Sequence, residues 1–193
     1  MPAILLASTS LHRRTLLARL GLPFTCAAPG VPENVLPGEP PAARAARLAL
    51  AKARAVASAN PEAIVIGSDQ VASLARPADP QLLHKPGDRA TCREQLRAMA
   101  GNTVRFDTAV AVIHGNRTLT HVDLTQVYLR QLDDAAIESY MDREPSFDCA
   151  GGFKCEGLGV TLFESIASHD PTALIGLPLI WVCAALRQLG VSP

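Results

Sequence analysis

An excess of charge of one sign is missing from this sequence. Its 18 Lys and Arg residues are balanced by 18 Asp and Glu residues, so the formal net charge is zero. Nucleic acids and anionic membranes attract proteins through a surplus of positive charge, and the balance therefore argues against both as partners. A site for an anionic ligand must instead be built locally.

A long hydrophobic run is also missing. The longest, residues 173–186, has 14 residues and contains Gly176 and Pro178, whereas a helix that spans a bilayer needs about 20. We expect a core-facing helix there. The apolar run at 4–7 is too short for a signal peptide and lacks a small-residue cleavage site after it. The sequence thus predicts neither a membrane span nor a secretory signal.

Clustered metal ligands and paired cysteines are absent as well. The five cysteines are scattered without a CxxC pair, and the five histidines show no ligand spacing. These absences argue against a structural zinc site and a disulfide framework. Free thiols are typical of a reducing compartment, and we expect a cytoplasmic protein.

The apolar runs and turn residues predict one α/β domain over residues 1–193. The segment 149–159 is glycine-rich but matches neither a Walker A loop nor GxGxxG. Loops are expected at 29–41 and 75–87, where prolines gather. Strands are predicted at 4–7, 24–28, 63–66, 103–114, 118–130 and 160–163, and helices at 11–20, 42–59, 88–100, 133–143 and 177–189.

The first informative pattern lies near the N-terminus. An apolar run of strand length, Ile4 to Ala7, is followed after three hydroxyl residues by a helical pattern. Ser10 is the predicted N-cap, and Gly21 ends the helix. Arg13 and Arg14 then lie in the first turn, where the helix dipole disfavours cations unless an anion binds. The turn is either a phosphate site or a capped helix whose arginines point into water.

A second polar segment follows a predicted strand. The apolar run 63–66 leads directly into Gly67, Ser68, Asp69 and Gln70. Ligands collect at the carboxyl ends of strands in open α/β sheets, which makes Asp69 and Gln70 candidates for chemistry. The alternative is an aspartate that only caps a turn.

Charged residues suited to a polyphosphate are spread along the chain. Carboxylates can hold a divalent cation, while Lys and Arg neutralise phosphate oxygens in the transition state. Glu33, in the proline-rich loop, and Asp69 suit the first task. Arg13, Lys52 and Lys85 suit the second. The alternative is that these cations are ordinary solvated side chains, which only their co-location would refute.

Short motifs follow one another in a recognisable order over nearly the whole chain. They are 6–10 (LASTS), Arg13-Arg14, Leu17, Leu20-Gly21, 67–71 (GSDQV), Lys85-Pro86, Ala150-Gly151, Phe153-Lys154, Glu156-Gly157 and 176–179 (GLPL). As a set they resemble the Maf-like nucleoside triphosphate pyrophosphatases. Gln70 and Glu156 resemble the 7-methyl-GTP branch, since the branch that handles dTTP and UTP has Thr and Gln there.

The resemblance implies a Maf/ITPase-like α/β fold, with a mixed, twisted sheet in two lobes and the nucleotide in a cleft between them. It implies hydrolysis of the α–β phosphate bond of 7-methyl-GTP, which gives 7-methyl-GMP and pyrophosphate and removes modified nucleotides from the pool. Mg²⁺ or Mn²⁺ would be required. By matching position, Asp69 would be the proton acceptor, Glu33 and Asp69 would hold metal, Ser8, Arg13, Lys52, Lys85 and Lys154 would bind substrate, and His12, Gln70 and Glu156 would select it.

Three positions depart from that branch. His12 stands where the branch has an aromatic residue, typically Trp, Leu11 where it usually has Pro, and Gly152 where it often has Ser. His12 matters most, because its smaller ring offers less stacking surface to the base.

Two other functions stay open from the sequence. One is pyrophosphatase activity on other canonical or modified nucleotides, and the other is a non-catalytic, nucleotide-binding regulator of cell division or septum formation. Pure binding would not need Asp69 as a base. The expected partner is a nucleoside triphosphate, with no nucleic acid or membrane, and a homodimer is compatible with the sequence.

Overall fold

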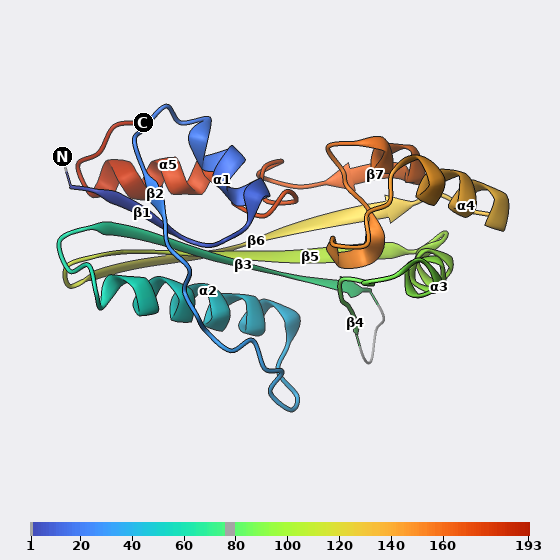
Figure 1. Ribbon diagram of the computed structural model, residues 1–193, viewed down its shortest axis with the longest axis horizontal. Coiled ribbons are helices and arrows are strands. Elements are labelled where there is room, and N and C mark those ends of the chain that lie inside the picture. Colours follow the sequence, from blue (N-terminus) through green and yellow to red (C-terminus); the bar gives the residue numbers. More distant parts are fainter. Residues whose placement is uncertain (1, 76–79) are drawn as a thin grey trace. The chain divides into compact units, whose positions relative to one another are not determined.

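The computed structural model describes residues 2–75 and 80–193, whose strands form one mixed sheet (Figure 1). The strands are β1 (Ile4–Ala7), β2 (Thr25–Cys26), β3 (Ile64–Leu74), β4 (Gln81–Leu83), β5 (Thr103–His114), β6 (Arg117–Leu129) and β7 (Phe163–Ala167). Their order is β2-β1-β3-β5-β6-β7, and β4 pairs with β3. Strand β1 runs parallel to β2 and β3, whereas β4 is antiparallel to β3 and β7 to β6. The predicted α/β class with a mixed sheet is confirmed.

The chain divides into two compact units. The first comprises Met1–Gln70, Asp107–Asp123 and His169–Pro193, and the second comprises Val71–Phe106 and Leu124–Ser168. Strands β3, β5 and β6 contribute residues to both units.

In the first unit, helices cover both faces of the sheet (Figure 1). The helices are α1 (Leu11–Ala18), α2 (Pro41–Ala57) and α5 (Leu179–Gln188). Leu6 and Ile66 are buried in a core cluster with residues of α1 and α5, while their neighbours Ala7 and Val65 belong to a cluster with residues of α2. Successive side chains of a strand point to opposite faces, so the apolar runs in β1 and β3 serve two cores at once.

In the second unit, α3 (Arg89–Met99) and α4 (Asp134–Arg143) contact each other. The starts of both helices agree with the prediction to within one residue. Asp88 and Asp133 are their N-cap residues, and the side chains of both accept hydrogen bonds from first-turn N–H groups. Three phenylalanine rings pack edge to face in this unit: Phe106 and Phe153 at 5.7 Å between centroids, and Phe153 and Phe163 at 5.0 Å.

The sequence ended the third strand too early. Strand β3 runs to Leu74 rather than ending at Ile66, so Gly67 to Gln70 lie within a strand and not after one. Extended backbone tolerates these polar residues because Ser68 and Asp69, both buried, find hydrogen-bond partners from other segments.

Two other segments differ from the prediction. Residues 160–163 were expected to form a strand, but 160–162 belong to the 3₁₀ helix η2 (Leu158–Leu162), and only Phe163 lies in a strand, as the first residue of β7. This tight turn buries Leu162 and leaves Val160 exposed. The predicted loop 75–87 contains the short strand β4, and its residues 76–79 lie outside the described part of the chain. Within that part, no helix is long and apolar enough to cross a membrane.

Candidate active site

The turn between β1 and α1 forms as the sequence predicted. Ser10 caps the helix, its Oγ accepting a hydrogen bond from Arg13 N at 3.4 Å. Ser8 is buried, and its Oγ accepts from Ser10 N at 3.1 Å. The hydroxyl groups thus fix the backbone of the turn, and the cap uses the N–H group of Arg13.

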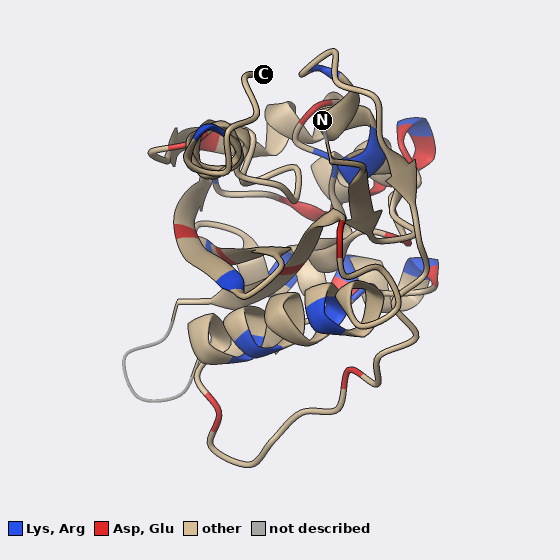
Figure 2. Cartoon of the chain, turned by 90° about the vertical axis from the view of Figure 1, so that its left-hand side faces the viewer, with Lys and Arg blue, Asp and Glu red and all other residues tan. Residues whose placement is uncertain are grey.

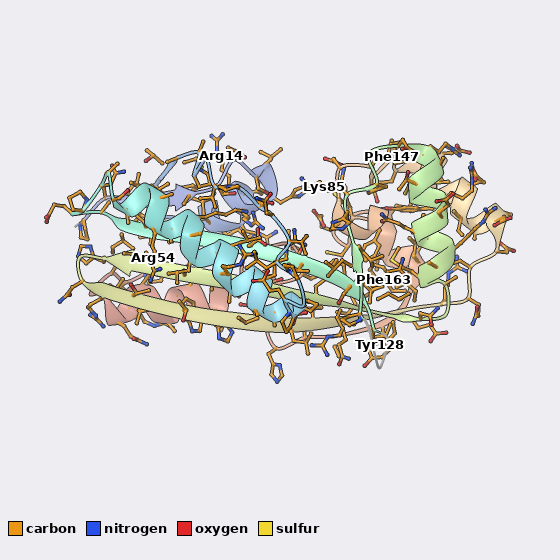
Figure 3. All side chains as sticks on the ribbon, turned by 90° about the horizontal axis from the view of Figure 1, so that it is seen from below. Arg14, Arg54, Lys85, Tyr128, Phe147 and Phe163 are labelled. Carbon is orange, nitrogen blue, oxygen red and sulfur yellow. The ribbon has the colours of Figure 1, made fainter. Side chains whose placement is uncertain are left out.

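The two arginines of this turn have different surroundings. Arg14 is exposed and points outward (Figure 3). Arg13 is half-buried, and its Nε donates to Gly176 O at 2.9 Å. Burial lowers the pKa of Arg13 from its ordinary value, while the carboxylates of Asp69 and Glu33 oppose that shift. Arginine stays protonated despite this shift, so Arg13 is a permanent positive charge that attracts both carboxylates.

The carbonyl of Gly176 joins three segments of the first unit. It accepts from Arg13 Nε, and Ser68 Oγ lies 2.9 Å from it and 2.7 Å from Ala109 O. The single hydroxyl proton of Ser68 donates to one of these carbonyls at a time. Gly176 has a φ of +122°, which favours glycine at this junction.

An ion-pair cluster lies on the other side of the strand. Lys52 Nζ lies 2.6 Å from Asp69 Oδ1 and 2.5 Å from Glu33 Oε1. The side chains of Lys52 and Asp69 are each 8% exposed, and that of Glu33 is 56% exposed. One predicted cation, Lys52, is therefore in contact with both predicted acids, and the charges of these acids also act on Arg13.

Glycine at position 67 makes this cluster possible. The lysine of the cluster, Lys52, lies on helix α2, which carries Lys and Arg but no Asp or Glu (Figure 2). A Cβ at Gly67 would lie 2.5 Å from Ala49 O and 2.6 Å from Ala53 N, both in the backbone of α2. Because Gly67 has no Cβ, α2 packs directly on β3 and Lys52 reaches Asp69.

The pKa of Asp69 is raised above its ordinary value. Burial is the main cause, and the negative charge of Glu33 adds to it. The ammonium of Lys52 and the guanidinium of Arg13 act in the opposite direction but do not cancel it. A carboxylate whose pKa is raised is a stronger base once it is ionised, and therefore a better proton acceptor, than an ordinary aspartate.

Gln70 is held by its amide nitrogen. Nε2 lies 2.9 Å from Thr108 Oγ1 and 3.0 Å from the carbonyl oxygens of Ala173 and Leu174. These contacts fix the orientation of the amide, so a ligand would meet its carbonyl oxygen as an acceptor. Sequence reasoning missed Thr108, although a polar pair, Asp107 and Thr108, in a run that is otherwise apolar could have signalled it.

Four predicted residues belong to other segments of the chain. His12 is half-buried in the first turn of α1. Lys85 is exposed after β4 (Figure 3), and Lys154 Nζ lies 3.6 Å from Asp148 Oδ1, both in the second unit. Glu156, exposed and also in the second unit, has the thiol of Cys155 3.3 Å from its Oε2. The roles of these four residues stay predictions.

The acids of the cluster suit a hard divalent cation. Mg²⁺ is usually held by one or two carboxylates, with substrate phosphates and water completing its shell. Glu33 and Asp69 supply two carboxylates that already share the charge of Lys52. Among the described residues no group of three or more His, Cys, Asp or Glu is arranged to hold a metal.

Comparison with known proteins shows that the chain belongs to the Maf-like protein family. The model of a family described as "Maf-like protein" matches residues 3–189. Proteins named "7-methyl-GTP pyrophosphatase" are similar over almost their whole length: one from Xanthomonas axonopodis pv. citri is 55% identical over 98% of both chains, and one from Albidiferax ferrireducens is 50% identical over 98% of this chain and 94% of its own. A solved HAM1 protein from Coxiella burnetii, 14% identical, covers 67% of this chain and 73% of its own with a TM-score of 0.44, too low to support an argument.

Proposed function

Because the chain belongs to the Maf-like protein family, we propose that it is a nucleoside triphosphate pyrophosphatase that converts 7-methyl-GTP to 7-methyl-GMP and pyrophosphate. The observation that carries the proposal is the buried Asp69, held by Lys52 and beside Glu33. The substrate follows from relatives about half identical over nearly the full chain, which are named for it. The protein would act in the cytoplasm on free nucleotides.

The chemistry assigned to Asp69 is proton acceptance. Its carboxylate takes a proton from the attacking water, whose oxygen forms a bond to phosphorus as the α–β anhydride bond breaks. The electron pair of that bond leaves with pyrophosphate, and the nucleoside monophosphate retains the new oxygen. The raised pKa of Asp69 favours this role because it strengthens the carboxylate as a base.

Cations of the chain would stabilise the phosphates during this step. Arg13, Lys52, Lys85 and Lys154 would bind the non-bridging oxygens, and the neutral hydroxyl of Ser8 would donate a hydrogen bond to one of them. A Mg²⁺ or Mn²⁺ ion bound to Glu33 and Asp69 would neutralise further phosphate charge.

Selection of the base would rest on charge and stacking. Methylation at N7 places a delocalised positive charge on guanine, which a carboxylate and a ring face would favour. Glu156 would supply the negative charge, His12 the ring, and the carbonyl oxygen of Gln70 an acceptor for the N–H edge of the base.

Pyrophosphate release across a panel of triphosphates tests the proposal. The panel holds 7-methyl-GTP, GTP, dTTP and UTP, each with Mg²⁺, with Mn²⁺ and with a chelator. We expect 7-methyl-GTP to give the highest kcat/KM and the chelator to abolish turnover. Equal kcat/KM for all four would contradict the substrate assignment, and binding without release of pyrophosphate would contradict catalysis.

A further inference from the structure

One carboxylate outside the proposed site holds the turn that carries Lys154 and Glu156. Glu144 follows helix α4 as its C-cap residue. Its Oε2 accepts a hydrogen bond from Gly159 N at 3.1 Å. Gly159 is buried, whereas Glu144 is half-buried. The side chain of Glu144 thus fixes the far end of residues 154–159, here called turn 154–159.

The glycines of turn 154–159 fit closely around this carboxylate. A Cβ at Gly157 would overlap Glu144 Oε1, and a Cβ at Gly159 would overlap the carbonyl oxygen of Lys154. Gly157 N also donates to Lys154 O at 3.2 Å, which closes the turn on itself. The turn is therefore shaped by contact with Glu144 and by its own backbone.

Tyr140 fixes the near end of the turn. Its side chain is buried, and Oη accepts a hydrogen bond from Lys154 N at 3.3 Å. The same oxygen lies 3.4 Å from Glu144 Oε2 and 3.1 Å from Ser146 Oγ. Burial raises the pKa of Tyr140 to about 12, so the hydroxyl keeps its proton and can donate it to Glu144. Tyr140 and Glu144 together hold both ends of turn 154–159.

We propose that Glu144 is a positioning residue for base selection, acting through the backbone of turn 154–159 on Glu156. This rests on the proposed function, in which Glu156 recognises the methylated base. Glu156 is exposed, so its reach is set mainly by where the backbone of the turn lies. A charged or hydrogen-bonding contact depends steeply on distance, so a displacement of the turn weakens selection by Glu156. Its effect on Lys154 falls on the phosphates, which 7-methyl-GTP and GTP share, and therefore cancels in the ratio of the two nucleotides.

The first test measures selectivity, defined as kcat/KM for 7-methyl-GTP divided by kcat/KM for GTP. We expect Glu144→Ala to lower it roughly tenfold, which corresponds to about 1.4 kcal/mol. Tyr140→Phe should lower it less, because the ring packing stays. Glu144→Gln should preserve most of it, since its amide oxygen still accepts from Gly159 N. The matched control is Asp142→Asn on the same helix, whose partner is Arg89 and which should not change selectivity.

A double-mutant cycle distinguishes positioning from a general structural role. If Glu144 acts through Glu156, Glu144→Ala should lower selectivity no further in a Glu156→Gln background. An additive loss, or an equal fall of kcat/KM for both nucleotides, would overturn the proposal.

Amide exchange of Gly159 keeps the test independent of the substrate assignment. Exchange should be faster in Glu144→Ala than in wild type, and near the wild-type rate in Glu144→Gln. Equal exchange in all three would overturn the positioning role. Wild-type protein that releases pyrophosphate from neither nucleotide would contradict the proposed function, while the exchange rates would still decide whether Glu144 holds the turn.

Discussion

Two groups of ion pairs in this molecule use the same chemistry in opposite surroundings. In the first unit, Lys52 contacts Asp69 and Glu33, and the Lys52–Asp69 pair is buried. In the second unit, arginines of α3 pair with acids of α4 on the surface: Arg89 with Glu138 and Asp142, Arg93 with Glu138, and Arg97 with Asp134. We call this second group the α3–α4 ladder.

The acids of the two groups respond to their cations in opposite ways. Hydrogen bonds from Arg93 and Arg89 lower the pKa of Glu138 to about 2. Asp69 also has a cationic partner, yet burial raises its pKa. A cation alone therefore does not decide the behaviour of a carboxylate, because loss of water can outweigh it. The ladder favours the ionised form of Glu138. In the Lys52 cluster, by contrast, burial makes Asp69 easier to protonate than an ordinary aspartate.

The largest expected effect comes from removing the buried acid. Asp69→Asn should lower kcat of pyrophosphate release by roughly 10²–10⁴-fold, the range for a lost general base. Glu138→Gln, the same change of charge in the ladder, should leave kcat close to wild type. Comparable losses in the two variants would show that Asp69 has no special role.

The next largest effect is expected from adding a side-chain atom between α2 and β3. Gly67→Ala places a Cβ against the backbone of α2, so either the helix or the strand must shift. We expect the free energy of unfolding to fall by about 1–3 kcal/mol, and turnover to fall because Lys52 moves away from Asp69. Denaturant unfolding and pyrophosphate release measure the two effects. Unchanged stability would contradict the close packing described for Gly67.

Asp123 sharpens the comparison because it is buried and the charge of a second acid, Asp170, acts on it. Its Oδ1 has no hydrogen-bond partner among the described residues, and His121 Nε2 lies 3.9 Å from Oδ2. Burial and the charge of Asp170 raise the pKa of Asp123. Stability should therefore fall as pH rises from the ordinary aspartate pKa through the raised value. We expect Asp123→Asn to increase the free energy of unfolding at pH 7 by up to about 1 kcal/mol, and a lower melting temperature would contradict this.

The smallest effect is expected in the ladder. Because the pKa of Glu138 is lowered to about 2, ionised Glu138 stabilises the folded state fully above the ordinary glutamate pKa. This stabilisation is lost as the pH falls from the ordinary glutamate pKa to about 2. Glu138→Gln should lower the melting temperature slightly at pH 7, and the difference from wild type should shrink on acidification. A difference that grows in acid would contradict the assignment, as would one that salt does not weaken.

Sequence patterns predicted the elements whose signals are local. Ser10, Asp88 and Asp133 cap helices through N–H groups three residues on, and such caps are readable from spacing. The interior of β3 was not readable, because Ser68 is satisfied by carbonyls 41 and 108 residues away. Glu144 was hidden for the same reason, since its partner Gly159 lies 15 residues further on.

For the site residues, too, the sequence predicted what is local and not what depends on distant contacts. Glu33, Asp69, Arg13 and Lys52 were named from type and motif, and the fold brings them together in the first unit. The burial of Lys52 and Asp69 was not predictable, because it depends on the absence of a side chain at Gly67, which lets α2 approach β3. An alanine-rich helix with interspersed Lys and Arg otherwise reads as a solvated surface.

The most direct measurement is a titration of carboxyl groups by ¹³C NMR, with Asp69→Asn and Glu138→Gln used to assign the two signals. The account predicts that Asp69 titrates above the ordinary aspartate pKa and Glu138 near 2. The acid limb of kcat/KM for 7-methyl-GTP should then follow the Asp69 titration, since its protonation removes the base. An Asp69 signal that titrates below the ordinary value, or an acid limb that does not follow it, would contradict the claim that burial makes Asp69 the proton acceptor.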